Sequence, residues 1–159
     1  MKSALNSPLE VAVRVLAILE AAFPCGLDVN RLVLFDYGLL HSHDLGGPTS
    51  LHPMLPLRAG ELGIKRRLID GGLQVLVRAG LAEMRVADQG VMFLAGESAA
   101  GFLAVLDSPY AIALKERSAW VAAQMSALDD AGLREQMRTV LGTWTEEFNT
   151  VPDSVIESM

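Results

Sequence analysis

Apolar residues recur at three- and four-residue spacing through much of the chain, as is typical of amphipathic helices. In the first half this spacing predicts helices over residues 8–23, 29–40 and 59–78. Ser7 stands before Pro8 and Glu10 in the manner of a capping box, and Asp28 stands at the start of the second helix. The apolar stripes predict the inward-facing residues, which are Leu9, Ala12, Val13, Leu16, Leu19, Ala22, Phe23, Leu32, Phe35, Leu39, Leu62, Leu68, Ile69, Leu73, Leu76 and Val77.

A β-hairpin is predicted directly after the third helix. Gly80 fits the left-handed position that ends a helix, and two short alternating runs over residues 81–86 and 91–94 flank a four-residue turn with Gly90. Three helices followed by a hairpin is the element order of a winged helix. The predicted fold class is therefore mostly α with a small β-hairpin, with a winged-helix-like domain over residues 1–96.

The last third of the chain reads as helical. A short helix is predicted over residues 98–106, a longer one from Ser108 to about residue 128, and a last one that Asp130 would cap. We expect residues 97–159 to form a helical extension packed on the first domain.

Composition favours a soluble cytoplasmic protein. Half of the residues are hydrophobic, Cys25 is the single cysteine, and charged residues interrupt the apolar segment 9–23, so it is neither a signal sequence nor a membrane span. The net charge is −6, with a local balance of +3 over residues 58–85 and of −6 over residues 97–159. An acidic chain binds nucleic acid poorly in general, because phosphate attraction depends on the number of cations.

The central basic run is the one candidate for a nucleic-acid contact. Lys65, Arg66 and Arg67 are consecutive, so they cannot share one face of a helix, and some of them must point to solvent. No Asn, Gln, Ser or Thr, the usual readers of base edges, lies between Gly60 and Ile69. We expect DNA to be contacted only indirectly or through a larger complex.

Residues 36–53 gather all three histidines of the chain together with several glycines and prolines. His41, His43 and His52, with Asp36 and Asp44, could be metal ligands because they offer nitrogen and oxygen donors. The alternative is that the imidazoles hold the loop in shape or contact a partner. No known metal-binding spacing accompanies them, so we favour the second interpretation and expect no metal and no cofactor.

No catalytic residue can be assigned. Cys25 has no histidine close in sequence, and Ser42 lacks the Gly-x-Ser-x-Gly pattern of a nucleophile elbow. A glycine-rich loop of the P-loop type is also missing, so the chain is not expected to be an ATPase or another enzyme.

Residues 36–61, which we call the motif segment, resemble a known family. The matching positions are Asp36, Tyr37, His41, Ser42, Asp44, Gly46, Gly47, Pro48, Ser50, Leu51, His52, Pro53, Leu57, Arg58 and Glu61. They are similar to the small middle component of bacterial ABC-three-component systems, which are Lamassu-like anti-phage defence operons built around an SMC/Rad50-type ATPase. His43 and the run over residues 62–66 depart from the pattern.

The resemblance implies a non-enzymatic subunit that bridges the SMC/Rad50-like ATPase and a variable effector, often a nuclease. It makes the motif segment the candidate partner-binding surface, with Asp36, Tyr37, His41, Asp44, His52, Arg58 and Glu61 as candidate contacts. Two alternatives remain: a free-standing winged-helix transcriptional regulator, and a small metal-dependent enzyme.

Overall fold

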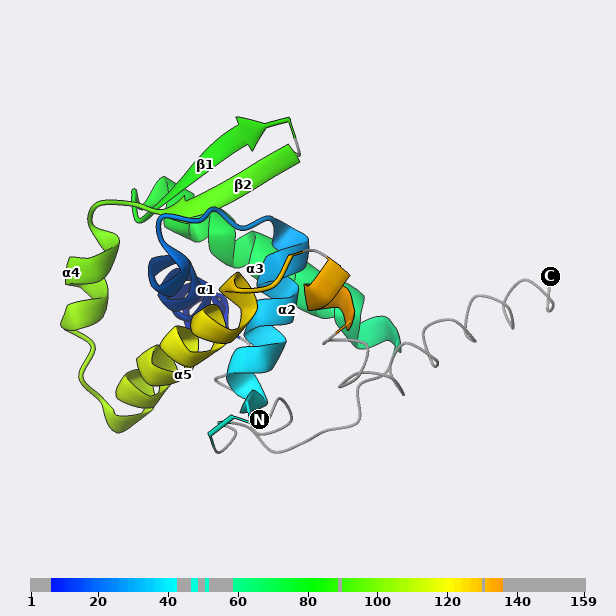
Figure 1. The fold of residues 1–159 in the computed structure, drawn as a ribbon. Coiled ribbons are helices and arrows are strands. Elements are labelled where there is room, and N and C mark those ends of the chain that lie inside the picture. Colours follow the sequence, from blue (N-terminus) through cyan, green and yellow to red (C-terminus); the bar gives the residue numbers. More distant parts are fainter. Residues whose placement is uncertain are drawn as a thin grey trace.

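The computed structural model describes residues 7–42, 47–48, 51, 59–88, 90–129 and 131–135, with the side chains of residues 59–62 outside this set. The helices and strands, in chain order, are α1 (Pro8–Ala22), α2 (Val29–Leu40), α3 (Ala59–Arg78), β1 (Ala82–Ala87), β2 (Gly90–Ala95), α4 (Ala99–Ala104) and α5 (Pro109–Ser126) (Figure 1). The structure confirms the predicted fold class, a mostly helical chain with a small hairpin. The winged-helix assignment stays a prediction.

Three helices begin where local sequence signals place them. The side chains of Ser7, Asp28 and Ser108 each accept a hydrogen bond from the backbone N–H three residues further on, at 3.2, 2.7 and 3.1 Å. Each bond satisfies an N–H group that has no partner within its helix. The predicted starts of α1, α2 and α5 are confirmed.

An aspartate also binds the start of residues 131–135. Asp129 accepts a hydrogen bond from the backbone N–H of Gly132, at 2.7 Å. Asp130 lies outside the described residues, so the predicted cap stays a prediction.

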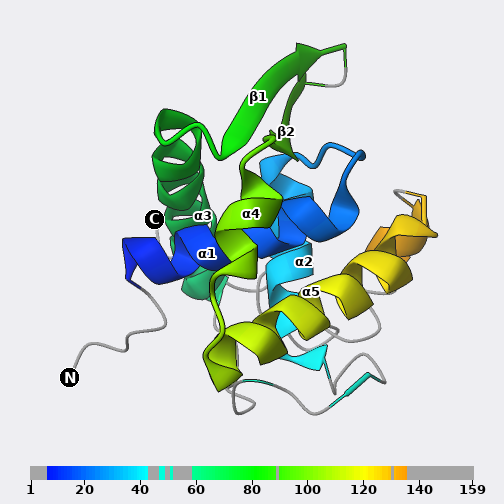
Figure 2. The ribbon, with the colours of Figure 1, turned by 90° about the vertical axis from the view of Figure 1, so that its left-hand side faces the viewer.

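Helix α1 lies at the centre and contacts α2, α3, α4, α5 and β2. Figure 2 shows α5 running along the opposite side of α1 from α3, while the hairpin projects from one end of the helical body. One core joins residues of α1, α2, α3, α5 and the hairpin, so the predicted extension after residue 96 shares the core of the first half. The boundary between two domains at residue 96 stays a prediction.

The predicted hairpin is confirmed. Strands β1 and β2 are antiparallel, with Ala82 opposite Ala95 and Ala87 opposite Gly90. Gly80 has φ of 75°, the left-handed conformation expected where α3 ends. Leu27, between α1 and α2, exchanges two backbone hydrogen bonds with Phe93 of β2, at 2.9 and 2.8 Å, so the hairpin is fastened to the helical body.

Three of the predicted core residues are exposed instead. Leu9, Phe23 and Val77 are 68%, 57% and 37% exposed, respectively. Leu9 lies in the first turn of α1, Phe23 follows its last residue, and Val77 lies in the last turn of α3. Periodicity alone predicts burial to the very ends of a helix, whereas the neighbouring elements cover only its middle.

Among the described residues, no helix combines the length and the apolar character that crossing a membrane would require.

Candidate functional site

A buried carboxylate joins three helices at the start of the motif segment. Asp36 of α2 is fully buried, and Arg14 of α1 is 3% exposed. The Nε and Nη2 atoms of Arg14 donate to the two carboxylate oxygens of Asp36 at 2.9 and 3.4 Å. Lys65 of α3, whose side chain is 18% exposed, donates from Nζ to Asp36 Oδ2 at 2.5 Å. We call Arg14, Asp36 and Lys65 the ion cluster.

Removing three charges from water is costly unless they neutralise one another with good hydrogen bonds. Arg14 makes two hydrogen bonds to one carboxylate, the arrangement to which a planar guanidinium is suited. Its neighbours in α1, from Val11 to Leu19, are otherwise apolar and almost entirely buried. The ion cluster therefore fixes the relative positions of α1, α2 and α3.

The pKa of Asp36 reflects this pairing. Burial by itself would raise the pKa, but the charges of Lys65 and Arg14 and their hydrogen bonds lower it from 3.8 to about 2. Burial by itself would lower the pKa of Arg14, but the charge of Asp36 and its hydrogen bond hold this pKa above its usual value. Asp36 is thus an anion and Arg14 a cation throughout the neutral range.

Helix α5 adds a tyrosine next to the ion cluster. Burial raises the pKa of the Tyr110 hydroxyl above its ordinary value, as do the charge of the Glu10 carboxylate and a hydrogen bond with it. Tyr110 also interacts electrostatically with Arg14 and Asp36, so the polar network extends from α3 through α1 and α2 to α5.

Two contacts of the motif segment lie at the end of α2. The rings of Tyr37 and His41 lie 4.8 Å apart between centroids, with their planes tilted by 40°. The backbone N–H of Leu51 donates to the carbonyl of Leu40 at 3.1 Å. This bond returns the chain to the last turn of α2 eleven residues later, so it closes the first part of the segment into a loop.

Ser42 and Gly47 hold the turn inside this loop. The buried Ser42 hydroxyl donates to the carbonyl of Pro48 at 2.8 Å, and the Gly47 N–H donates to the carbonyl of Ser42 at 2.9 Å. A Cβ atom at Gly47 would overlap the indole ring of Trp120 in α5. The position therefore requires glycine because the backbone lies directly against an aromatic ring.

The chain matches the protein-family model of the ABC-three component (ABC-3C) system Middle Component 2 over residues 4–147. The chain belongs to this family. Comparisons with the curated proteins and with solved structures found no match. This match confirms the resemblance that the motifs indicate. It extends well beyond the first half of the chain, in which the motifs lie. A middle component works within a system of several components.

The structure places the candidate partner-binding residues of this middle component in different environments. Asp36 and Tyr37 are buried in the single chain, and their assignment as partner contacts stays a prediction. His41 is half-buried. The remaining candidates lie outside the described residues or have side chains outside them, namely Asp44, His52, Arg58 and Glu61.

The three candidate nucleic-acid contacts lie in different environments. Lys65 is engaged in the ion cluster, so a phosphate would have to compete with Asp36 for it. Arg66 is exposed and donates to the side-chain oxygen of Asn30 in α2, and Arg67 is exposed. The helix offers two exposed cations here instead of three.

Sequence reasoning missed Arg14, Tyr110 and Trp120 as partners of the motif. One signal was present for Arg14: a single cation in a run of apolar residues needs a buried anion, and Asp36 is the acid in the apolar second helix. Nothing in the sequence marked the pairing of Gly47 with Trp120, since the two residues are far apart in the chain.

Within the described residues no group of three His, Cys, Asp or Glu side chains is placed to hold a metal ion. The predicted alternative involving His43, Asp44 and His52 lies outside those residues, and the expectation of no metal stays a prediction.

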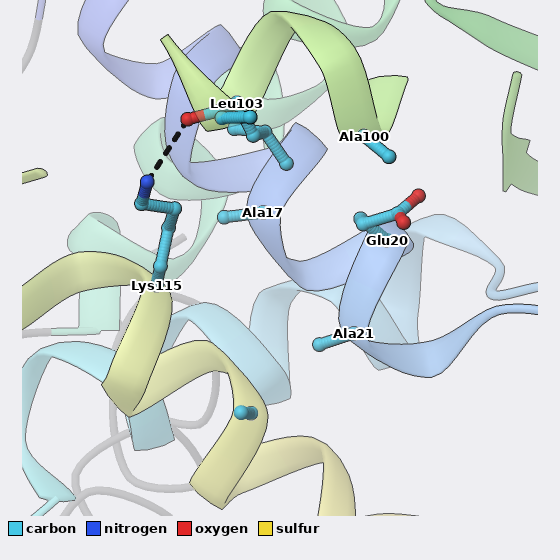
Figure 3. A pocket seen from close by; sticks show the side chains of 8 residues that line it. Ala17, Glu20, Ala21, Ala100, Leu103 and Lys115 are labelled. Atoms are coloured by element: carbon cyan, nitrogen blue, oxygen red, sulfur yellow. Dashed lines mark hydrogen bonds between the residues drawn. The ribbon is translucent and has the colours of Figure 1, made fainter. Parts of the chain in front are cut away.

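A small hollow of about 290 Å³ lies between α1, α4 and α5 (Figure 3). Alanine side chains line most of it, including Ala17, Ala21 and Ala100. Lys115, at its wall, donates to the carbonyls of Leu103 and Leu106 at 3.0 and 2.9 Å, so its charge closes the C-terminal end of α4. The lining is mostly alanine, so it provides few reactive groups.

Proposed function

We propose that this middle component is a non-enzymatic accessory subunit of an anti-phage defence complex, in which it bridges an SMC/Rad50-like ATPase and a variable effector. The observation that carries the proposal is the family match over residues 4–147. The identity of the two partners is inferred from the resemblance of the motifs to Lamassu-like systems. DNA is reached indirectly, through the complex.

The arrangement of the motif supports a role in binding rather than chemistry. Arg14 and Lys65 bind Asp36, and Leu51 donates to the carbonyl of Leu40 in α2. Ser42, just after α2, donates to the carbonyl of Pro48. These bonds hold the described residues near the end of α2 in a fixed arrangement, and a preorganised binding segment loses less entropy on binding. His41, Asp44, His52, Arg58 and Glu61 are the contacts that we propose for this surface.

The free-standing regulator is the weaker alternative. Such a protein would need its basic residues free for phosphates, whereas Lys65 is paired with Asp36 and the chain carries a net charge of −6. We expect only weak binding to duplex DNA without sequence preference. Sub-micromolar, sequence-selective binding at physiological salt would favour the regulator instead.

The experiment is co-purification of the tagged chain with the ATPase and the effector encoded beside it. We expect a stable complex with the wild-type chain and loss of assembly when His41, Asp44 and His52 are changed together to Ala. Glu116→Ala, on an exposed position of α5, is the matched control and should assemble normally. A melting curve for each variant separates the loss of a contact from the loss of the fold.

Two results would contradict the proposal. If the wild-type chain purifies alone from cells that express all components, it is not a subunit of the complex. If the triple variant folds and assembles normally, the loop is not the partner-binding surface, although the chain could still be a subunit through another face.

A further inference from the structure

Among the described residues, no strand pairs with the outer edge of β1. On its other side β1 pairs with β2, and the far edge of β2 is in turn covered by the bridge between Leu27 and Phe93. Figures 1 and 2 show the hairpin projecting from the helical body with β1 as its outermost strand. All residues of β1 after Ala82 are exposed, and the strand has neither a proline nor a bulge. Prolines and bulges are two of the devices that protect an edge strand from pairing with another chain.

The hydrogen bonds of Phe93 show which groups of β1 face outward. Phe93 uses both its N–H and its C=O to bind Leu27. Its partner in β1, Met84, is therefore in a pair without mutual hydrogen bonds, and the N–H and C=O of Met84 point to the open edge. By alternation, the same holds for Ala82 and Val86. Gly96 donates to Leu81, which agrees with odd-numbered residues facing β2.

We propose that two copies of this chain pair through β1, antiparallel, with Met84 opposite Met84 of the second copy. In this register Ala82 lies opposite Val86 of the second copy. The Met84 pair joins two exposed residues with outward-pointing backbone groups, so it can exchange both of its hydrogen bonds. Ala82 is buried in the single chain and has to be uncovered before it can bind Val86 of the second copy. A two-fold axis through the Met84 pair relates the copies, and the assembly closes as a dimer with a four-stranded sheet.

The charges on the strand select this register. Glu83 and Arg85 form an exposed pair within one chain, at 3.2 Å. In the proposed dimer Glu83 lies opposite Arg85 of the second copy, and Arg85 lies opposite Glu83. These are pairs without mutual hydrogen bonds, in which side chains approach most closely. A shift by two positions in either sense would instead place Glu83 opposite Glu83 or Arg85 opposite Arg85.

The opposite face of the strand is apolar. Met84 and Val86 are 57% and 80% exposed in the single chain. Pairing through β1 would bring the two Met84 side chains together and place each Val86 beside an Ala82, so an interrupted set of apolar side chains becomes one continuous row. The strand is thus self-complementary in its hydrogen bonds, its charges and its apolar face.

The test is sedimentation velocity of the full chain over a concentration series. We expect a monomer–dimer equilibrium for the wild type. E83R and R85E should each weaken self-association about tenfold or more, because each places like charges opposite one another. The double variant E83R/R85E restores opposite charges and should dimerise like the wild type. An equimolar mixture of E83R and R85E should form a heterodimer.

A second variant tests the backbone. Met84→Pro removes the central outward N–H without removing a hydrogen bond of the hairpin, and it should abolish the dimer while the circular dichroism spectrum stays unchanged. Three results would overturn the proposal: a wild type that stays monomeric at millimolar concentration, a mixture of E83R and R85E that stays monomeric, or a dimer that survives Met84→Pro. A monomeric wild type whose ATPase binding is lost in Met84→Pro would assign the edge to a strand of that partner instead.

Discussion

The ion cluster and the hairpin pair Glu83–Arg85 use the same kinds of charged group in opposite surroundings. Asp36 is fully buried and holds three helices together, whereas the side chains of Glu83 and Arg85 are 53% and 64% exposed on one strand. Inside the molecule a charge that loses its partner is costly to keep, so the ion cluster belongs to the fold. On the surface, water replaces a lost partner, so the same chemistry contributes little to stability and is available for association.

Replacing Asp36 is the most direct test of this difference between the buried and the exposed charges. Asp36→Asn leaves Arg14 and Lys65 without their anion, and we expect a loss of about 3–5 kcal/mol in the free energy of unfolding. Urea denaturation measures it. Glu83→Gln is the matched surface control and should change stability by less than about 0.5 kcal/mol. Equal effects of the two variants would refute the contrast.

A second variant tests the contact between Gly47 and the ring of Trp120. Gly47→Ala places a methyl group where the Trp120 ring lies, and we expect a loss of about 1–3 kcal/mol. Gly71→Ala is the control, since nothing lies within 4 Å of the added Cβ in α3, and it should stabilise the helix by up to about 1 kcal/mol. Thermal unfolding of both variants and of Gly47→Ala combined with Trp120→Leu measures the contact. A Gly47→Ala protein as stable as the wild type would mean that the ring moves aside freely.

The third prediction concerns pH. The pKa of Asp36 is lowered to about 2 from 3.8, so its ionised form stabilises the fold above about pH 4, and this contribution is lost as the pH falls toward 2. We expect the loss to be on the order of 2 kcal/mol. Denaturation curves between pH 5 and pH 2, compared with those of Asp36→Asn, measure it. Parallel pH profiles for the two proteins would show that other carboxylates dominate.

The smallest expected effect is at the hairpin. A double-mutant cycle of Glu83→Ala and Arg85→Ala, measured at concentrations where the chain is monomeric, should give a coupling energy below about 0.5 kcal/mol. Raising the salt concentration should reduce it further. A coupling energy above about 1 kcal/mol would mean that this surface pair stabilises the fold as the ion cluster does, and the contrast between them would be wrong.

The elements that the sequence predicts well are those fixed by neighbouring residues. Ser7, Asp28 and Ser108 cap helices through the amide three positions away, and Gly80 ends a helix through its own backbone conformation. These signals require no knowledge of the rest of the fold. The hairpin is predicted for the same reason.

The candidate site was harder to predict because its contacts join distant parts of the chain. Arg14 and Asp36 are separated by 22 positions, and Asp36 and Lys65 by 29. The motif marked Asp36, but a family pattern does not show whether a residue is buried. Its burial depends on how α1 and α3 pack on α2.

The bridge between Leu27 and Phe93 has a mechanical consequence. Its two hydrogen bonds lie side by side across antiparallel backbones, so a pull along β2 loads both of them in shear at the same time. A force along β2 is therefore transmitted to the segment between α1 and α2 through two hydrogen bonds at once.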